Sequence, residues 1–93
     1  MERIIEKLFG AIVRRHREGI GVSQEGFADR AGIHRTYVSS IERGKVQISI
    51  GIAHKLAEAL GVPLSRLWSE LEAELSDAGK AKPATSKRRP PSA

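Results

Sequence analysis

The chain contains no cysteine, and its apolar stretches are short. Disulfide bonds are therefore excluded, which is typical of proteins in a reducing cytoplasm. Charged residues interrupt every apolar stretch well before the roughly 20 residues that a membrane-spanning helix needs. The first ten residues, MERIIEKLFG, carry Glu2 and Glu6 in a helical pattern and do not resemble a signal peptide. The sequence therefore predicts a cytoplasmic protein with no membrane partner.

Signals for catalysis and for metal binding are also missing. His16, His34 and His54 are widely spaced, so that no recognisable metal-binding motif is present. Ser39 and Ser40 lack the context of a nucleophile elbow. No segment shows the sustained alternation of a strand, and hence no glycine-rich phosphate loop follows one. We expect no enzyme activity, no catalytic residues, no metal and no cofactor.

Size and charge limit what remains. A chain of 93 residues makes one small domain. Its net charge of +5 favours an anionic partner, and nucleic acid is the leading candidate. Residues 77–93 hold five basic residues against Asp77, whereas residues 1–76 hold 11 basic and 10 acidic residues. Because residues 77–93 contain almost no large apolar side chain, we expect a folded domain over 1–76 and a disordered basic tail over 77–93.

Helical periodicity and capping residues predict an all-α fold of five short helices. The helices are expected over residues 2–18, 24–31, 34–43, 50–60 and 63–75. Ser23 and Ser49 are good N-cap residues for the second and fourth helices. Gly32, Gly44 and Gly61 are expected to end three of the helices, since glycine tolerates a left-handed conformation. In the first helix, one apolar face is expected to contain Ile5, Leu8, Phe9, Ile12 and Val13.

The third helix has a polar face with no evident structural purpose. Val38 and Ile41 are predicted to face inward, which leaves polar side chains outward from the first turn onward. A helix presented in this way fits the major groove of DNA, with its N-terminal residues nearest the base edges. The alternative is that this face is merely exposed to solvent.

Five spaced positions give a family resemblance. Gln24, Ala28, Gly32, Val38 and Ile41, the last within IERG at 41–44, resemble the helix-turn-helix of the lambda-repressor/Cro type, also called the Xre family. The resemblance covers roughly residues 8–72. The segment HRTYVSSIERGK further resembles restriction-modification controller proteins, which are small, dimeric, operator-binding regulators. This family resemblance implies a compact lambda-repressor-like domain. Such a domain binds a pseudo-palindromic operator in double-stranded DNA as a homodimer and regulates transcription. No small-molecule effector domain is evident.

The resemblance also implies roles for individual residues. The residues expected to contact bases are Arg35, Thr36 and Ser40. Those expected to contact the DNA backbone are Gln24, His34, Tyr37, Ser39, Arg43, Lys45 and Gln47. Tyr37 has the alternative of packing against the body of the domain. Arg17 and Glu42 occupy positions of a semi-buried ion pair between the first and third helices. Where controller proteins often have a basic residue, this chain has Val46, which departs from the pattern.

The fifth helix carries an apolar stripe that suggests a dimer interface. Leucines and a tryptophan recur at three- and four-residue spacing, and the outer end near Leu71 is expected to have little to pack on. The predicted interface residues are Leu67, Trp68, Leu71 and Leu75. The alternative is that the stripe belongs wholly to the core of the monomer.

Two other functions are alternatives to DNA-binding regulation. An antitoxin-type protein-interaction module that also binds DNA needs an added apolar patch or a tail that folds on its partner, and residues 77–93 lack such a patch. A membrane-surface protein is suggested by the basic tail, but the tail lacks the apolar residues that insert into lipid.

Overall fold

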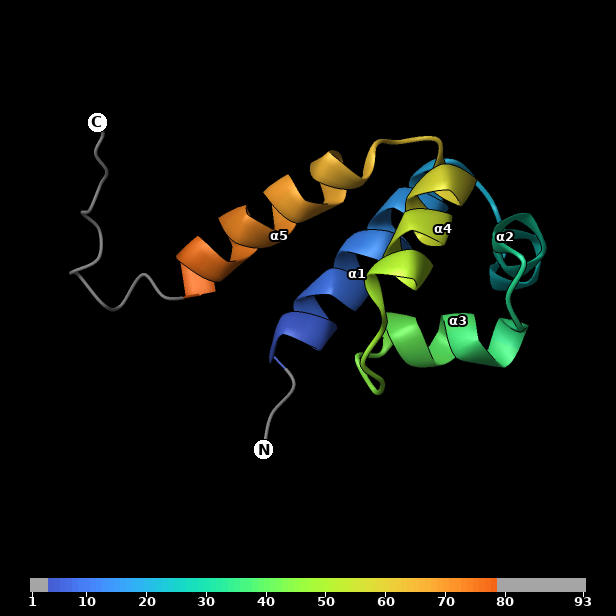
Figure 1. Cartoon of the computed structure of the whole chain (residues 1–93), viewed down its shortest axis with the longest axis horizontal. Helices are drawn as coiled ribbons and strands as arrows, with labels where there is room; N and C mark the ends of the chain where they lie inside the picture. The colour runs from blue at the N-terminus through green and yellow to red at the C-terminus, as the bar shows by residue number, and fades with distance from the viewer. Residues whose placement is uncertain (1–3, 79–93) are drawn as a thin grey trace.

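The computed structural model describes residues 4–78. In this part of the chain five helices are joined by short turns and loops (Figure 1). The helices are α1 (Ile4–Gly19), α2 (Gln24–Ala31), α3 (Arg35–Glu42), α4 (Ile50–Leu60) and α5 (Leu64–Ala78). The predicted all-α class with five helices is confirmed. The predicted disordered tail lies outside the described residues, except for its first two positions, which belong to α5. Within residues 4–78 no helix is both long and apolar enough to cross a membrane.

Local capping signals explain why α2 and α4 begin and end where the sequence predicts. The Ser23 hydroxyl accepts a hydrogen bond from the Gly26 amide at 2.9 Å, and the Ser49 hydroxyl accepts one from the Ile52 amide at 3.0 Å. At the other ends, Gly32 and Gly61 adopt left-handed φ angles of 72° and 77°. Side chains with a β-carbon rarely adopt this conformation, so glycine allows the chain to leave both helices sharply.

The remaining helices differ from the prediction at their ends. α3 is one residue shorter at each end, because His34 and Arg43 are its capping residues. α1 is already helical at Ile4, the first described residue, and ends one residue later than expected, at Gly19; the predicted positions 2 and 3 lie outside the described residues. α5 continues three residues beyond the predicted position 75.

The core lies where α1 packs against α3 and α4 on one side and α5 on the other, and α2 completes it by packing on α3 and α4 (Figure 1). The largest fully buried side chains are Phe27, Ile12, Leu56, Leu67, Val13 and Val38. Every helix contributes at least one of them, so the five helices share one core. On the predicted apolar face of α1, Ile5 in the first turn is 53% exposed and lies outside this core.

A close contact between α1 and the end of α3 fixes where α3 lies. A β-carbon added to Gly10 would collide with the carbonyl oxygen of Ile41 and would lie 2.8 Å from that of Glu42. Gly44 has a left-handed φ of 70°, and a β-carbon there would lie 2.6 Å from the α-carbon of Lys7. Both positions therefore require glycine. The close helix approach is therefore at Gly10 and Gly44, and not at the turn between α2 and α3, where a β-carbon on Gly32 would meet nothing within 4 Å.

Candidate nucleic-acid interface

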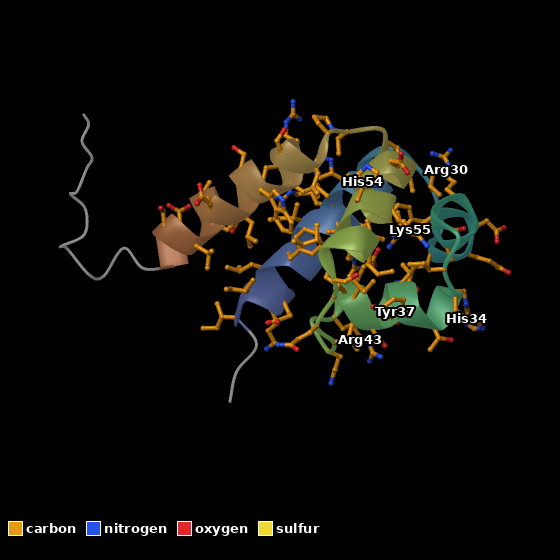
Figure 2. The ribbon with its side chains drawn as sticks, in the orientation of Figure 1. Arg30, His34, Tyr37, Arg43, His54 and Lys55 are labelled. Atoms are coloured by element: carbon orange, nitrogen blue, oxygen red, sulfur yellow. The ribbon has the colours of Figure 1, made fainter. Side chains whose placement is uncertain are left out.

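The outward face of α3 is anchored from behind by buried residues. Val38 and Ile41 are 1% and 2% exposed, whereas Arg35 and Thr36 in the first turn are exposed and Ser40 is half-buried. Figure 2 shows His34 and Arg43 at opposite ends of this helix, with Tyr37 between them. The first turn of α3 thus presents its side chains to solvent on a helix that the core holds rigidly.

His34 has a capping role that the sequence did not indicate. Its Nδ1 accepts a hydrogen bond from the Thr36 amide at 3.2 Å. In the neutral ring the proton then resides on Nε2, which is left as a donor on an exposed side chain. His34 can therefore cap α3 and still donate a hydrogen bond to a phosphate oxygen.

Tyr37 and Ser39 are less accessible than the first-turn residues. Both are half-buried, and Tyr37 packs against the hydrophobic core. This contact agrees with the alternative in which Tyr37 supports the body of the domain. Their predicted backbone contacts stay predictions.

An ion pair joins α1 to the end of α3. Arg17 donates from Nε to Glu42 Oε2 at 2.7 Å and from Nη2 to Oε1 at 3.1 Å. Its Nη1 donates to the Val22 carbonyl oxygen at 2.8 Å. The hydrogen bond with Glu42 raises the pKa of Arg17, although burial acts in the opposite direction. Because both side chains are largely buried, this pair fixes α3 on α1 rather than decorating the surface.

Gln24 is a third member of this network. It is the first residue of α2, and its Nε2 donates to Glu42 Oε1 at 3.0 Å. This bond holds the amide group in one orientation at the start of the helix. Within the described part of the chain its carbonyl oxygen and its second N–H make no hydrogen bond, so the amide can still contact a phosphate.

The cations around α3 have no ion-pair partner in the part of the chain that the structure describes. Arg35, Arg43 and Lys45 are exposed and form no ion pair with any described residue. By contrast, the three arginines of α1, namely Arg14, Arg15 and Arg17, all pair with glutamates. Gln47 is exposed beside Lys45, and Val46 between them turns toward the core. Positive charge without partners therefore gathers at the two ends of α3.

The same segment carries the family signature. A helix-turn-helix family model matches residues 13–67, which include α2, α3 and α4. The chain belongs to the Xre-type helix-turn-helix family. In this helix-turn-helix motif the two helices are α2 and α3, and the turn between them comprises residues 32–34. The resemblance inferred from five spaced positions is confirmed.

Several relatives within this helix-turn-helix family are control proteins. Control protein C.MunI from a Mycoplasma species is 43% identical over 58 residues, which are 62% of this chain and 78% of that protein. Control protein C.BamHI from Bacillus amyloliquefaciens is 43% identical over 63 residues, 67% of this chain and 78% of that protein. The crystal structure of the restriction-modification controller protein C.AhdI from Aeromonas hydrophila matches with a TM-score of 0.66 at 36% identity. That match covers 71% of this chain and 98% of the other.

Beside the helix-turn-helix motif lies an apolar groove of about 120 Å³. Its walls are α1, α5 and the loop that follows α3. Trp68 on the α5 wall is 37% exposed, and its ring centroid lies 5.4 Å from that of Phe9. The residues that line this groove are Ile5, Glu6, Phe9, Ile41, Val46, Ile48, Trp68 and Leu71. Because Ile41 is the second-last residue of α3, the groove begins at the C-terminal end of α3.

The burial of the α5 leucines changes the prediction that the apolar stripe on α5 forms a dimer interface. Leu67 is completely buried and Leu71 is 8% exposed, so both pack in the core of the protomer. The expectation that Leu71 has little to pack on is wrong, because α5 lies along α1 over this stretch. Leu75 is half-buried and Trp68 is partly exposed. These two residues, together with Ile5 on the groove wall formed by α1, are among the apolar side chains that remain partly exposed.

Proposed function

We propose that the protein is a sequence-specific DNA-binding regulator of transcription that binds a pseudo-palindromic operator as a homodimer. One observation carries this proposal: the first turn of α3 exposes Arg35 and Thr36, while the same helix is held from behind by buried residues. A rigid helix with an exposed polar N-terminal turn suits base reading in the major groove. The unpaired cations at both ends of α3 supply charge for the adjacent phosphates.

The apolar groove supports the homodimer. A two-fold interface uses the same patch on both subunits, and partly exposed apolar residues around a groove can serve as such a patch. Since Ile41 lines the groove, a second copy docked there would turn the C-terminal ends of the two α3 helices toward each other. Two such helices about one DNA turn apart, roughly 34 Å, match half-sites centred about 10 base pairs apart.

The identity with control proteins supports a narrower role. C.MunI and C.BamHI are control proteins, and C.AhdI is a restriction-modification controller. We infer that this chain also controls a restriction-modification operon. A reporter gene placed behind the operator should change expression when the protein is supplied.

Selection of bound sequences from a random pool of duplex DNA, at a stated salt concentration, tests the proposal. It yields the motif, its symmetry and the half-site spacing together. We expect an inverted repeat with half-sites about 10 base pairs apart. Recovery of no enriched sequence would refute sequence-specific binding, and an asymmetric single site would refute the two-fold arrangement.

Replacing Arg35 with alanine should weaken operator binding by about 1–3 kcal/mol and relax the preference at one base pair. An arginine in this position can donate two hydrogen bonds to O6 and N7 of guanine, so the affected pair should be a G·C. Repeating the selection with the variant measures the change directly. An unchanged motif would remove Arg35 from the set of base-reading residues.

Lys45 and Gln24 should differ in how their loss affects salt dependence. Lys45→Ala should weaken specific and non-specific duplexes alike and make the salt slope shallower by about one unit, because one fewer phosphate is neutralised. Gln24→Ala should weaken binding while leaving the slope nearly unchanged, because the amide carries no charge. Titrations at several salt concentrations distinguish the two. A Lys45 variant with altered base preference and the wild-type slope would contradict the assignment.

A further inference from the structure

Lys7 lies against the end of α3, although it is far from that helix in sequence. A β-carbon on Gly44 would be 2.6 Å from both the α-carbon and the γ-carbon of Lys7, so the two backbones are in direct contact. Figure 1 likewise shows the N-terminal end of α1 beside the loop that follows α3. Gly44 stands between Arg43 and Lys45 in the chain, and thus three cations surround one buried glycine.

Among the described residues, these three cations have no acidic partner. Lys7, Arg43 and Lys45 are all exposed, and none forms an ion pair within residues 4–78. Three like charges around one glycine repel one another unless an anion lies among them. The arrangement is also rigid, because the left-handed Gly44 and the close approach of Gly10 to Ile41 hold α1 on the end of α3. The charge cluster is therefore presented as a unit with α3.

We propose that Lys7 binds the phosphate backbone of duplex DNA, together with Arg43 and Lys45, beyond the C-terminal end of α3. This inference rests on the proposed function. α3 spans eight residues, or about 12 Å, which is comparable to the width of the major groove. When its first turn reads base edges, the residues just past its last turn lie beside the phosphates where the helix leaves the groove. Lys7 extends this contact onto α1, a helix that the helix-turn-helix motif does not include.

The test uses a variant that removes the charge and keeps the packing. Lys7→Gln retains the β- and γ-carbons, and the γ-carbon is the side-chain atom closest to Gly44. Arg66→Gln is the matched control, since it also removes one exposed cation, from the first turn of α5 at the top of Figure 1, away from α3 at the bottom. Affinity is measured for the selected operator and for an unrelated duplex of equal length, each at several salt concentrations. Circular dichroism melting establishes that both variants are folded.

We expect Lys7→Gln to bind both duplexes about fivefold to tenfold more weakly at 0.1 M salt, with a salt slope shallower by about 0.9. Lys7→Arg should restore both quantities, and Lys7→Gln combined with Lys45→Gln should lower the slope by about 1.8. Arg66→Gln should match the wild type. If Lys7→Gln binds as the wild type does, or if Arg66→Gln is equally impaired, the assignment of Lys7 is wrong while DNA binding stands. Absence of wild-type binding to either duplex would instead refute the proposed function itself.

Discussion

Replacing Glu42 with alanine should lower the free energy of unfolding by about 3–5 kcal/mol. The carboxylate accepts two hydrogen bonds from Arg17 and one from Gln24, and its side chain is only 2% exposed. Without it, the Arg17 guanidinium stays charged in a site where its side chain is 10% exposed, with the Val22 carbonyl and, at 4.0 Å, the exposed Glu18 carboxylate as its remaining partners. For a domain of this size the loss corresponds to a melting temperature lower by at least about 12 °C.

The exposed pair on the same helix provides the control. Arg14 and Glu18 are as close as 2.9 Å, but their side chains are 60% and 54% exposed. Water solvates either partner when the other is removed, so Arg14→Ala should cost no more than about 0.5 kcal/mol. Chemical or thermal denaturation followed by circular dichroism compares the two variants. Equal costs would show that burial does not distinguish these pairs and that Glu42 is not the anchor of α3.

The buried pair of Arg17 and Glu42 should keep its stabilising effect at alkaline pH. Glu42 raises the pKa of Arg17, so Arg17 is more firmly protonated in the folded chain than in the unfolded chain. Such a group contributes its full stabilisation below the unfolded-state pKa and loses it only as the pH rises through the folded-state pKa. The difference in unfolding free energy between wild type and Glu42→Ala should therefore be the same at pH 7 as at about pH 10.

Those features of the fold that depend on neighbours in sequence could be predicted from sequence. Ser23 and Ser49 bond to amides three residues on, and Gly32 and Gly61 need only their own φ angle, so the bounds of α2 and α4 follow from local chemistry. The pairing of Arg17 with Glu42 was reached by resemblance, since no local pattern links residues 25 positions apart.

Features that depend on distant parts of the chain could not be predicted in this way. Gly10 lies within a helix, where no local feature requires glycine. The reason for glycine there is the close approach of the Ile41 backbone, which leaves no room for a β-carbon. Periodicity placed Ile5 and Leu71 on apolar stripes but could not tell which end of each stripe another helix covers. The structure shows that α1 covers Leu71 of α5, whereas Ile5 of α1 stays 53% exposed. For the same reason the contact of Lys7 with Gly44 could not be predicted from the residues around Lys7 or from those around Gly44.

The exposed walls of the groove lead to the second large effect. Ile5→Gln combined with Trp68→Gln should raise the dissociation constant of the homodimer by about a hundredfold or more. Fully burying a large apolar side chain contributes about 1.5–3 kcal/mol, and these two side chains are 53% and 37% exposed in the protomer. Each would complete its burial only in a dimer. A two-fold interface contains both residues twice, so the summed loss is about 3–5 kcal/mol. Glutamine adds no charge and hence does not itself repel DNA.

Ile20→Gln serves as the control, because Ile20 is 45% exposed and lies at the other end of α1, away from the groove. Sedimentation at micromolar concentration should show a dimer for the wild type and for this control, and a monomer for the double variant. Trp68 is the single tryptophan in the chain, so its emission in the wild type should shift to shorter wavelength as dimers form on raising the concentration. The double variant should also bind the operator with one half-site occupied at a time. A wild type that sediments as a monomer would exclude the homodimer. A double variant that stays dimeric would place the interface elsewhere, because no subunit contact through the groove could keep its affinity after both exposed walls become polar.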